Sequence, residues 1–160
     1  MSFAYTNNGL SFRTVSSPGE LVAGEIFFDH VPSPTELQGA FPGYVAGVVA
    51  GLLVDKLAAG CKIISTGTPA VSATYGIDPE TQKNIIAVGL YIVVNSRFPA
   101  GQTTWPLPDL TGVPVSFPNT ATFMAVMTAL ADYVSGLYLV ANSLAMGNVA
   151  PWPDQPITIA

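Results

Sequence analysis

Charged residues are what this chain has least of. Only 9% of its 160 residues are Asp, Glu, Lys or Arg, whereas soluble domains carry roughly 25%. The hydrophobic residue types make up 49% of the chain. Because a soluble monomer normally keeps charges on its surface, we expect a surface of neutral polar residues and loops that other protein chains cover in part.

Basic residues are especially few. Ten acidic side chains outnumber five basic ones, for a net charge of −5, and the basic residues stand singly along the chain: Arg13, Lys56, Lys62, Lys83 and Arg97. Without a basic stripe, binding to nucleic acid has no electrostatic basis. Binding to an anionic membrane surface is excluded for the same reason.

Cysteine and histidine each occur once. Cys61 cannot form an intramolecular disulfide, and a chain without disulfides fits the reducing cytoplasm. A lone cysteine is typically a small buried hydrophobe. His30 lies in an expected loop beside Asp29, but neighbours in sequence rarely face each other productively, so a structural or solvent-facing role is expected. One His and one Cys cannot fill a structural zinc site, and no metal or cofactor is predicted.

Motifs of catalysis are also missing. There is no GxSxG, no HExxH and no P-loop, and the spacing of the acids forms no calcium loop. Asp78 and Asp109 are the two acids considered as a carboxylate pair for glycoside hydrolysis, although Asp78 is better explained as a helix cap. The sequence therefore predicts a protein that is not an enzyme.

Two long apolar runs are candidates for membrane spans. Residues 43–54 (GYVAGVVAGLLV) fall short of the roughly 20 residues that a span needs. Residues 123–146 are long enough, but Asp132 lies within them, and an aspartate at the bilayer centre costs about 3 kcal/mol or more. No secretory signal is visible at the start of the chain. We expect no membrane span and two buried helices.

Turn and cap signals divide the first part of the chain. Asn7-Asn8-Gly9 separates two short strand patterns and predicts a hairpin. Ser33, Pro34 and Glu36 form a capping box that starts a helix, and Pro42 breaks it. A second helical stretch reaches Ala59. Its Gly43, Gly47 and Gly51 recur every fourth residue, a spacing that allows close helix packing.

The second part alternates between strands and helices. Residues 61–77 predict a strand pair around a Gly-Thr-Pro turn. Asp78 caps a helix that runs to about Arg97 and carries apolar residues on two neighbouring faces, so broad burial is expected. Segments 103–107 and 113–117 predict a short hairpin, and Asn119 caps the last helix.

The last helix carries an apolar seam at spacings of four and three. Such a 3.5-residue repeat over about three heptads is typical of a coiled coil. It predicts a partner interface, with self-association as one outcome, and leaves open an ordinary core helix. The seam consists of Phe123, Met127, Leu130, Val134, Leu137, Ala141 and Leu144.

The chain ends in a Pro-rich segment, 148–160, which is expected to be extended and polyproline-like. Pro151, Trp152 and Pro153 would form a docking arm if Trp152 is exposed; the alternative is that Trp152 folds back on its own domain. The whole chain is then α+β, with three main helices. Residues 1–32 are a strand module, 33–60 a broken apolar helix, and 61–147 an α+β domain ending in the long helix.

Several segments resemble small bacteriophage proteins encoded near tail fibres. In the N-terminal strand module the resemblance lies in Phe12-Arg13, Leu21, Gly24-Glu25, Phe27 and Pro32-Ser33. From GCKIISTGTPAVSATYGIDPETQKNI through FPAGQTTWPLPD and GVPVSFP to the last helix, the chain is similar to an uncharacterised C-terminal domain of tail-fibre and tail-fibre-assembly proteins. The closing PWPDQP resembles the ends of tail-fibre assembly chaperones.

This resemblance implies a structural component of a phage tail, made in the bacterial host cytoplasm and retained in the virion. Its partners would be other tail proteins and further copies of itself, with a trimer as one arrangement. The alternative is an assembly chaperone that binds the fibre during maturation. A glycan-binding or glycan-degrading tail module is a third possibility. The low charge of this chain departs from ordinary assembly chaperones and favours the virion component.

Overall fold

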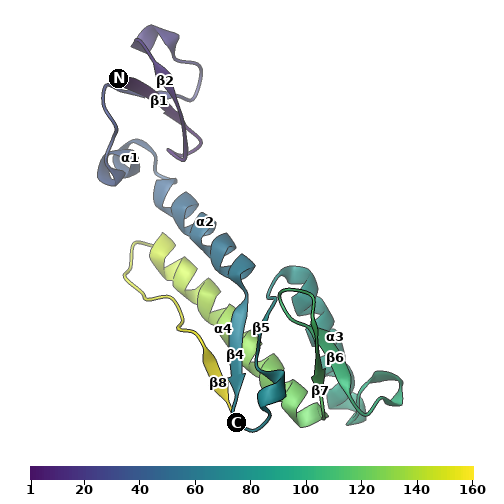
Figure 1. Ribbon diagram of the computed structural model, residues 1–160. Helices are drawn as coiled ribbons and strands as arrows, with labels where there is room; N and C mark the ends of the chain where they lie inside the picture. Colours follow the sequence, from purple (N-terminus) through teal and green to yellow (C-terminus); the bar gives the residue numbers. More distant parts are fainter. The chain divides into compact units, whose positions relative to one another are not determined.

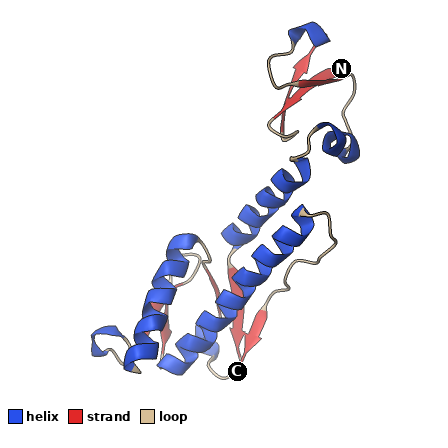
Figure 2. Ribbon diagram, turned by 180° about the vertical axis from the view of Figure 1, so that it is seen from behind, coloured by secondary structure: helices blue, strands red, loops and turns tan.

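The fold is α+β, as predicted, with four α-helices and three small sheets (Figures 1 and 2). It was obtained as a computed structural model that describes residues 1–160. The chain divides into two compact units, Met1–Leu52 with Ala141–Ala150, and Leu53–Val140 with Pro151–Ala160. Helices α2 (Tyr44–Ala59) and α4 (Thr120–Ala145) each contribute to both units.

The first unit contains a three-stranded antiparallel sheet. Its strands are β1 (Ser2–Thr6), β2 (Ser11–Val15) and β3 (Ile26–Phe28), in the order β2-β1-β3. Asn7, Asn8 and Gly9 turn the chain between β1 and β2 with positive φ angles of 51°, 55° and 79°. Asn and Gly are the residue types that adopt this conformation most readily, so the predicted hairpin is confirmed.

An ion pair between Arg13 and Glu25 links β2 to the loop before β3. The Arg13 guanidinium donates from Nε to Glu25 Oε1 at 2.9 Å and from Nη2 to Glu25 Oε2 at 2.8 Å, a bidentate geometry. It also donates to the Glu20 carbonyl. The hydrogen bond from Arg13 holds the pKa of the Glu25 carboxyl below its usual value. Both residues belong to the motif on which the resemblance of the strand module rests.

Helix α1 (Pro34–Ala40) begins at the predicted capping box. The Ser33 hydroxyl accepts from the Glu36 N–H, and the Glu36 carboxylate accepts from the Ser33 N–H at 2.8 Å. Leu37 and Phe41 then pack with Phe3 and Tyr5 of β1 in a small core. Helix α2 follows the predicted break at Pro42.

The second unit has two small sheets. Strand β4 (Cys61–Ser65) lies between β5 (Ala73–Tyr75), which is antiparallel to it, and β8 (Ile157–Ile159), which is parallel. Strands β6 (Trp105–Pro108) and β7 (Pro114–Phe117) form the predicted hairpin. Helix α3 (Pro79–Asn95) and α4 lie on one side of these strands in both views (Figures 1 and 2). Short 3₁₀ turns occupy Pro18–Glu20, Pro69–Val71 and Pro99–Gly101.

The helix ends of this unit follow their predicted caps. The Asp78 carboxylate accepts from the N–H groups of Glu80 and Thr81 at 3.0 and 3.1 Å, and Asn119 Oδ1 accepts from the Thr122 N–H at 2.8 Å. At the end of α2, Gly60 adopts a φ of +73°, the left-handed conformation that ends many helices. The predicted caps therefore gave the correct starts of α3 and α4 and the correct end of α2.

One hydrophobic core joins β4, β5, α3, β6, β7 and α4. Phe123 of α4 packs edge-on against Phe98 and Phe117, with ring centroids 5.9 and 5.2 Å apart. Tyr75 is fully buried there and donates its hydroxyl hydrogen to the Val71 carbonyl. The core is thus aromatic at the end where the β6–β7 hairpin meets the start of α4.

Candidate functional surfaces

The seam of α4 belongs to the chain's own core. Phe123, Leu130, Val134 and Leu137 are buried in the core of the second unit, and Met127 packs against it half-buried. The other two predicted interface residues are Ala141, which is buried, and Leu144, which is half-buried. The predicted partner interface along this seam is corrected accordingly. The spacing marks the inner face of a core helix, the alternative explanation of the same pattern.

The predicted glycine face packs closely, but against a hairpin. A Cβ at Gly43 would lie 2.8 Å from Cγ of Asn8, and a Cβ at Gly47 would lie 2.5 Å from Cδ1 of Leu10. Gly51 faces open space. The first two glycines therefore let the β1–β2 turn approach the start of α2. Their predicted role in helix–helix packing is not what this structure shows.

From Pro151 onward the Pro-rich tail is part of the second unit and is not a free docking arm. Trp152 is half-buried against the core, and Pro153 lies against Gly136 of α4. Gln155 then accepts from the Lys62 N–H at 2.9 Å and donates to the Gly60 carbonyl at 3.0 Å. Strand β8 follows and pairs with β4. The predicted docking role of Pro151, Trp152 and Pro153 is corrected, since Trp152 folds back on its own domain.

Helix α3 exposes a wide apolar face, contrary to the expected broad burial. Its buried residues are Ile85, Gly89 and Ile92. On the opposite side Ile86, Leu90, Val93 and Val94 are 53%, 62%, 67% and 80% exposed. The periodicity correctly showed that two faces are apolar. It could not show that the chain supplies a packing partner for one of them only.

Helix α2 is also apolar and largely exposed. Val49 is its one buried residue, while Val48, Leu52 and Val54 are exposed. Leu53 and Leu57 reach the edge of the core of the second unit. The expected burial of this helix is therefore not provided by the chain itself.

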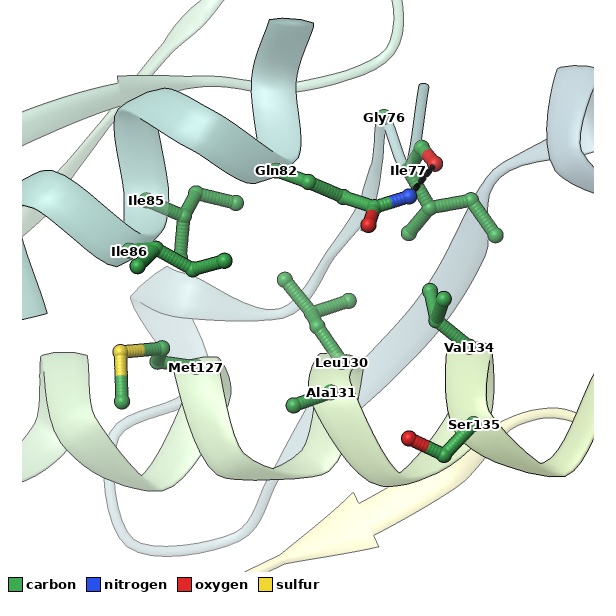
Figure 3. A pocket seen from close by; sticks show the side chains of 10 residues that line it. All are labelled: Gly76, Ile77, Gln82, Ile85, Ile86, Met127, Leu130, Ala131, Val134 and Ser135. Atoms are coloured by element: carbon green, nitrogen blue, oxygen red, sulfur yellow. Dashed lines mark hydrogen bonds between the residues drawn. The ribbon is translucent and has the colours of Figure 1, made fainter. Parts of the chain in front are cut away.

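A shallow groove of about 220 Å³ lies between α3 and α4 (Figure 3). Its walls are mostly apolar and include Ile86, Met127 and Leu130, with Gln82 and Ser135 as polar members. Gln82 Nε2 donates to the Ile77 carbonyl at 2.6 Å. No side chain that titrates near neutral pH lines the groove, so it offers no acid–base chemistry.

His30 lies between two carboxylates in the first unit. Its Nδ1 is 2.6 Å from Asp29 Oδ1, and its Nε2 is 3.1 Å from Glu36 Oε1. Hydrogen bonding to Asp29, and then to Glu36, raises the pKa of His30. Asp29 therefore does face its neighbour, contrary to expectation. The Ser33 hydroxyl donates to Glu36 and not to His30, so the group lacks the nucleophile–base pair of a hydrolase.

The two acids considered for glycoside hydrolysis serve local structure. Asp78 caps α3, and Asp109 Oδ1 accepts from the N–H groups of Thr111 and Val113 at 2.8 and 2.9 Å. Hydrogen bonds from Thr81 and Thr111, respectively, lower the pKa of each carboxyl. A glycosidase needs one carboxyl of raised pKa as its general acid, so neither residue suits that role.

The remaining candidates are a metal site and a membrane-spanning helix. No group of three or more His, Cys, Asp or Glu side chains is arranged to hold a metal ion. Helix α4 is long and apolar enough to cross a membrane. Helices α1 and α2 are also long and apolar enough if they are taken together as one bent segment. The core helix of a soluble protein can have the same length and composition, so the absence of a membrane span stays a prediction.

Comparison of the chain with family models, curated proteins and solved structures found no match. Two surfaces remain as candidates. They are the exposed apolar faces of α2 and α3, and both suit contacts with protein.

Proposed function

We propose that this chain is a structural component of a bacteriophage tail, a tail-fibre or fibre-associated protein that acts through protein–protein contacts. It is made in the cytoplasm of the bacterial host and retained in the virion. The resemblance of its motifs to small phage tail proteins suggests the setting. The exposed apolar surface of α2 is the observation that supports the mode of action.

From Tyr44 to Val54 helix α2 has no charged residue, and Asp55 and Lys56 are its only two. Exposed apolar area costs roughly 25 cal/mol per Å² relative to burial. Contiguous apolar patches beyond a few hundred Å² are rare on monomers and mark interaction sites. A tail protein is permanently surrounded by other chains, so a helix of this kind is covered once the particle is assembled.

The charge distribution supports the same role. The chain has neither a basic stripe for nucleic acid nor a cluster of ligands for a metal, and its groove carries no acid–base group. The exposed apolar faces of α2 and α3 are the surface features that a partner protein would cover. A partner with the required chemistry is a protein that presents an apolar surface of its own, and the proposal assigns this place to other tail proteins.

Quantitative mass spectrometry of purified particles tests this proposal, using a phage that encodes the chain. A tail component is expected in a fixed ratio to other tail proteins, and at the same ratio after the particles are washed in high salt, since apolar contacts are not screened by salt. A chain that is abundant in infected cells and absent from particles contradicts the proposal. That result favours the assembly chaperone.

A further inference from the structure

The turn between β1 and β2 contains the dipeptide Asn8-Gly9. An asparagine that precedes glycine loses its side-chain amide spontaneously in flexible peptides, because no glycine side chain hinders the approach of the glycine nitrogen to the asparagine Cγ. All other asparagines of the chain precede larger residues: Asn7, Asn84, Asn95, Asn119, Asn142 and Asn148. Asn8 is therefore the position at which this reaction meets the least steric hindrance.

The folded turn keeps the two reacting groups apart. Asn8 has a φ of 55°, and in the left-handed conformation the Cβ of a residue lies on the opposite side of its Cα–C bond from the next nitrogen. The Gly9 N–H also donates to the Thr6 carbonyl at 3.0 Å. The attacking nitrogen is thus turned away from Asn8 Cγ and is occupied by a hydrogen bond, so the reaction requires the turn to open.

Packing of the turn against the start of α2 opposes this opening. Gly9 is buried, and a Cβ on it would lie 3.1 Å from ring carbons of Phe41 and Tyr44. The Asn8 side chain lies against Gly43, and Leu10 lies against Gly47 one turn further along the helix. All these residues belong to the first unit. The turn therefore opens only when it leaves this surface.

We propose that Asn8 is a site of spontaneous deamidation, and that opening of the β1–β2 turn from α2 controls its rate. In the open turn the Gly9 nitrogen gives up its proton to water or hydroxide and forms a bond with Asn8 Cγ. The bond from Cγ to Nδ2 breaks, and ammonia leaves with the proton it gains. Water then adds to either carbonyl of the resulting five-membered ring and opens it to aspartate or isoaspartate.

The two products differ in their effect on the turn. Aspartate leaves the backbone unchanged and places its carboxylate beside the first turn of α2, where the helix dipole favours negative charge. In isoaspartate the main chain passes through the side-chain carbons and is one carbon longer. The hydrogen bonds from Gly9 to Thr6 and from Leu10 to Asn7 then no longer fit the packed turn. Formation of isoaspartate is thus expected to hold the hairpin away from α2 irreversibly.

Incubation of the full chain at mildly alkaline pH, in buffer and in urea, tests the proposal by peptide mapping with mass spectrometry. The tryptic peptide that ends at Arg13 contains only Asn7 and Asn8 among the asparagines, and fragment ions distinguish the two. Asn8 is expected to react first in urea and at least about tenfold more slowly in buffer, because only open copies react. Equal rates in buffer and in urea overturn the proposal, as does another asparagine that reacts before Asn8 in urea.

Two glycines of α2 provide a matched pair of variants. Gly43→Ala is expected to raise the rate in buffer severalfold, since its Cβ would overlap the Asn8 side chain. Gly51→Ala makes the same change where the helix faces open space, and should leave the rate unchanged. Leu10→Ala, which removes the contact with Gly47, replaces Gly43→Ala if the latter unfolds the chain. Rates in buffer that match Gly51→Ala for both Gly43→Ala and Leu10→Ala overturn control by the turn.

Urea unfolding separates the effects of the two products. Asn8→Asp carries the aspartate product alone and is expected to unfold at the wild-type midpoint, whereas the isoaspartate fraction, isolated by chromatography, is expected to unfold at a lower one. Equal midpoints for the two would contradict the loss of packing. The inference does not depend on the proposed phage role, because every measurement uses the isolated chain. Its failure would leave the proposed function standing.

Discussion

Gly89 of α3 lies directly against the side chain of Met127 of α4, so closely that a methyl group on Gly89 would overlap the Met127 sulfur. This is a point of close approach between the two helices. Ile85 and Ile92, about one turn away on either side of Gly89, are buried in the core of the second unit. The glycine therefore lies at the centre of the buried face of α3 and lets that face approach α4 closely.

Gly89→Ala is expected to lower the free energy of unfolding by about 1–3 kcal/mol, because overpacking a close helix contact displaces a side chain or the backbone. Urea unfolding measures the change. In a Met127→Ala background the same substitution is expected to cost less, since the obstructing sulfur is gone. Equal costs in both backgrounds would show that Met127 does not limit the approach.

Trp152 is expected to stabilise the second unit. Trp152→Ala should lower the free energy of unfolding by about 1–3 kcal/mol, less than for a fully buried Trp because the ring is half-buried. Val149→Ala, at a fully exposed position of the same segment, is the control and should change stability by less than about 0.5 kcal/mol. An unchanged stability in Trp152→Ala would instead support a free docking arm.

Cys61 is expected to be unreactive in the folded chain. Burial raises the pKa of its thiol to about 12, so the nucleophilic thiolate is scarce at pH 8, and the side chain is fully buried. Ellman's reagent should label the thiol slowly in the native protein and at once in denaturant. Rapid labelling under native conditions, without unfolding, would contradict this environment.

His30 is expected to make the first unit sensitive to pH. Its pKa is raised in the fold by Asp29 and Glu36, so the protonated ring is favoured by folding. The resulting stabilisation is complete below the unfolded pKa of about 6.5 and is lost as the pH rises through the higher folded value. NMR titration of the His30 ring checks the direction of the shift, with His30→Gln as the variant whose stability lacks this dependence. A folded pKa at or below the ordinary value would rule out the two-carboxylate environment.

Local signals in the sequence predicted the elements well. The Ser33 capping box, the Asp78 cap and the Asn7-Asn8-Gly9 turn each depend on residues within a few positions, and each lies where it was expected. Such features need no knowledge of distant parts of the chain. They account for the correct helix starts and for the two hairpins.

Non-local packing could not be predicted in the same way. The parallel pairing of Ile157–Ile159 with β4 joins segments about ninety residues apart, and only the alternation of Ile157, Thr158 and Ile159 hinted at a strand. Periodicity likewise showed that faces of α3 and α4 are apolar. It did not reveal that the apolar face of α4 is buried in the chain's own core, whereas Leu90 on the outer face of α3 is exposed.

Incorporation of a Val54→Glu variant into particles is the most direct test of the account. Val54 is 63% exposed on the apolar face of α2, so the variant should fold normally while placing a carboxylate on the face that the proposed function assigns to contact with other tail proteins. Phage lacking the gene would be complemented with the wild-type chain, Val54→Glu, or the control Thr128→Glu at an exposed polar position of α4. Mass spectrometry of the particles should find the wild type and Thr128→Glu at equal ratios to other tail proteins, and Val54→Glu strongly depleted. Particles that retain Val54→Glu in full, or that contain none of the three proteins, would contradict the account.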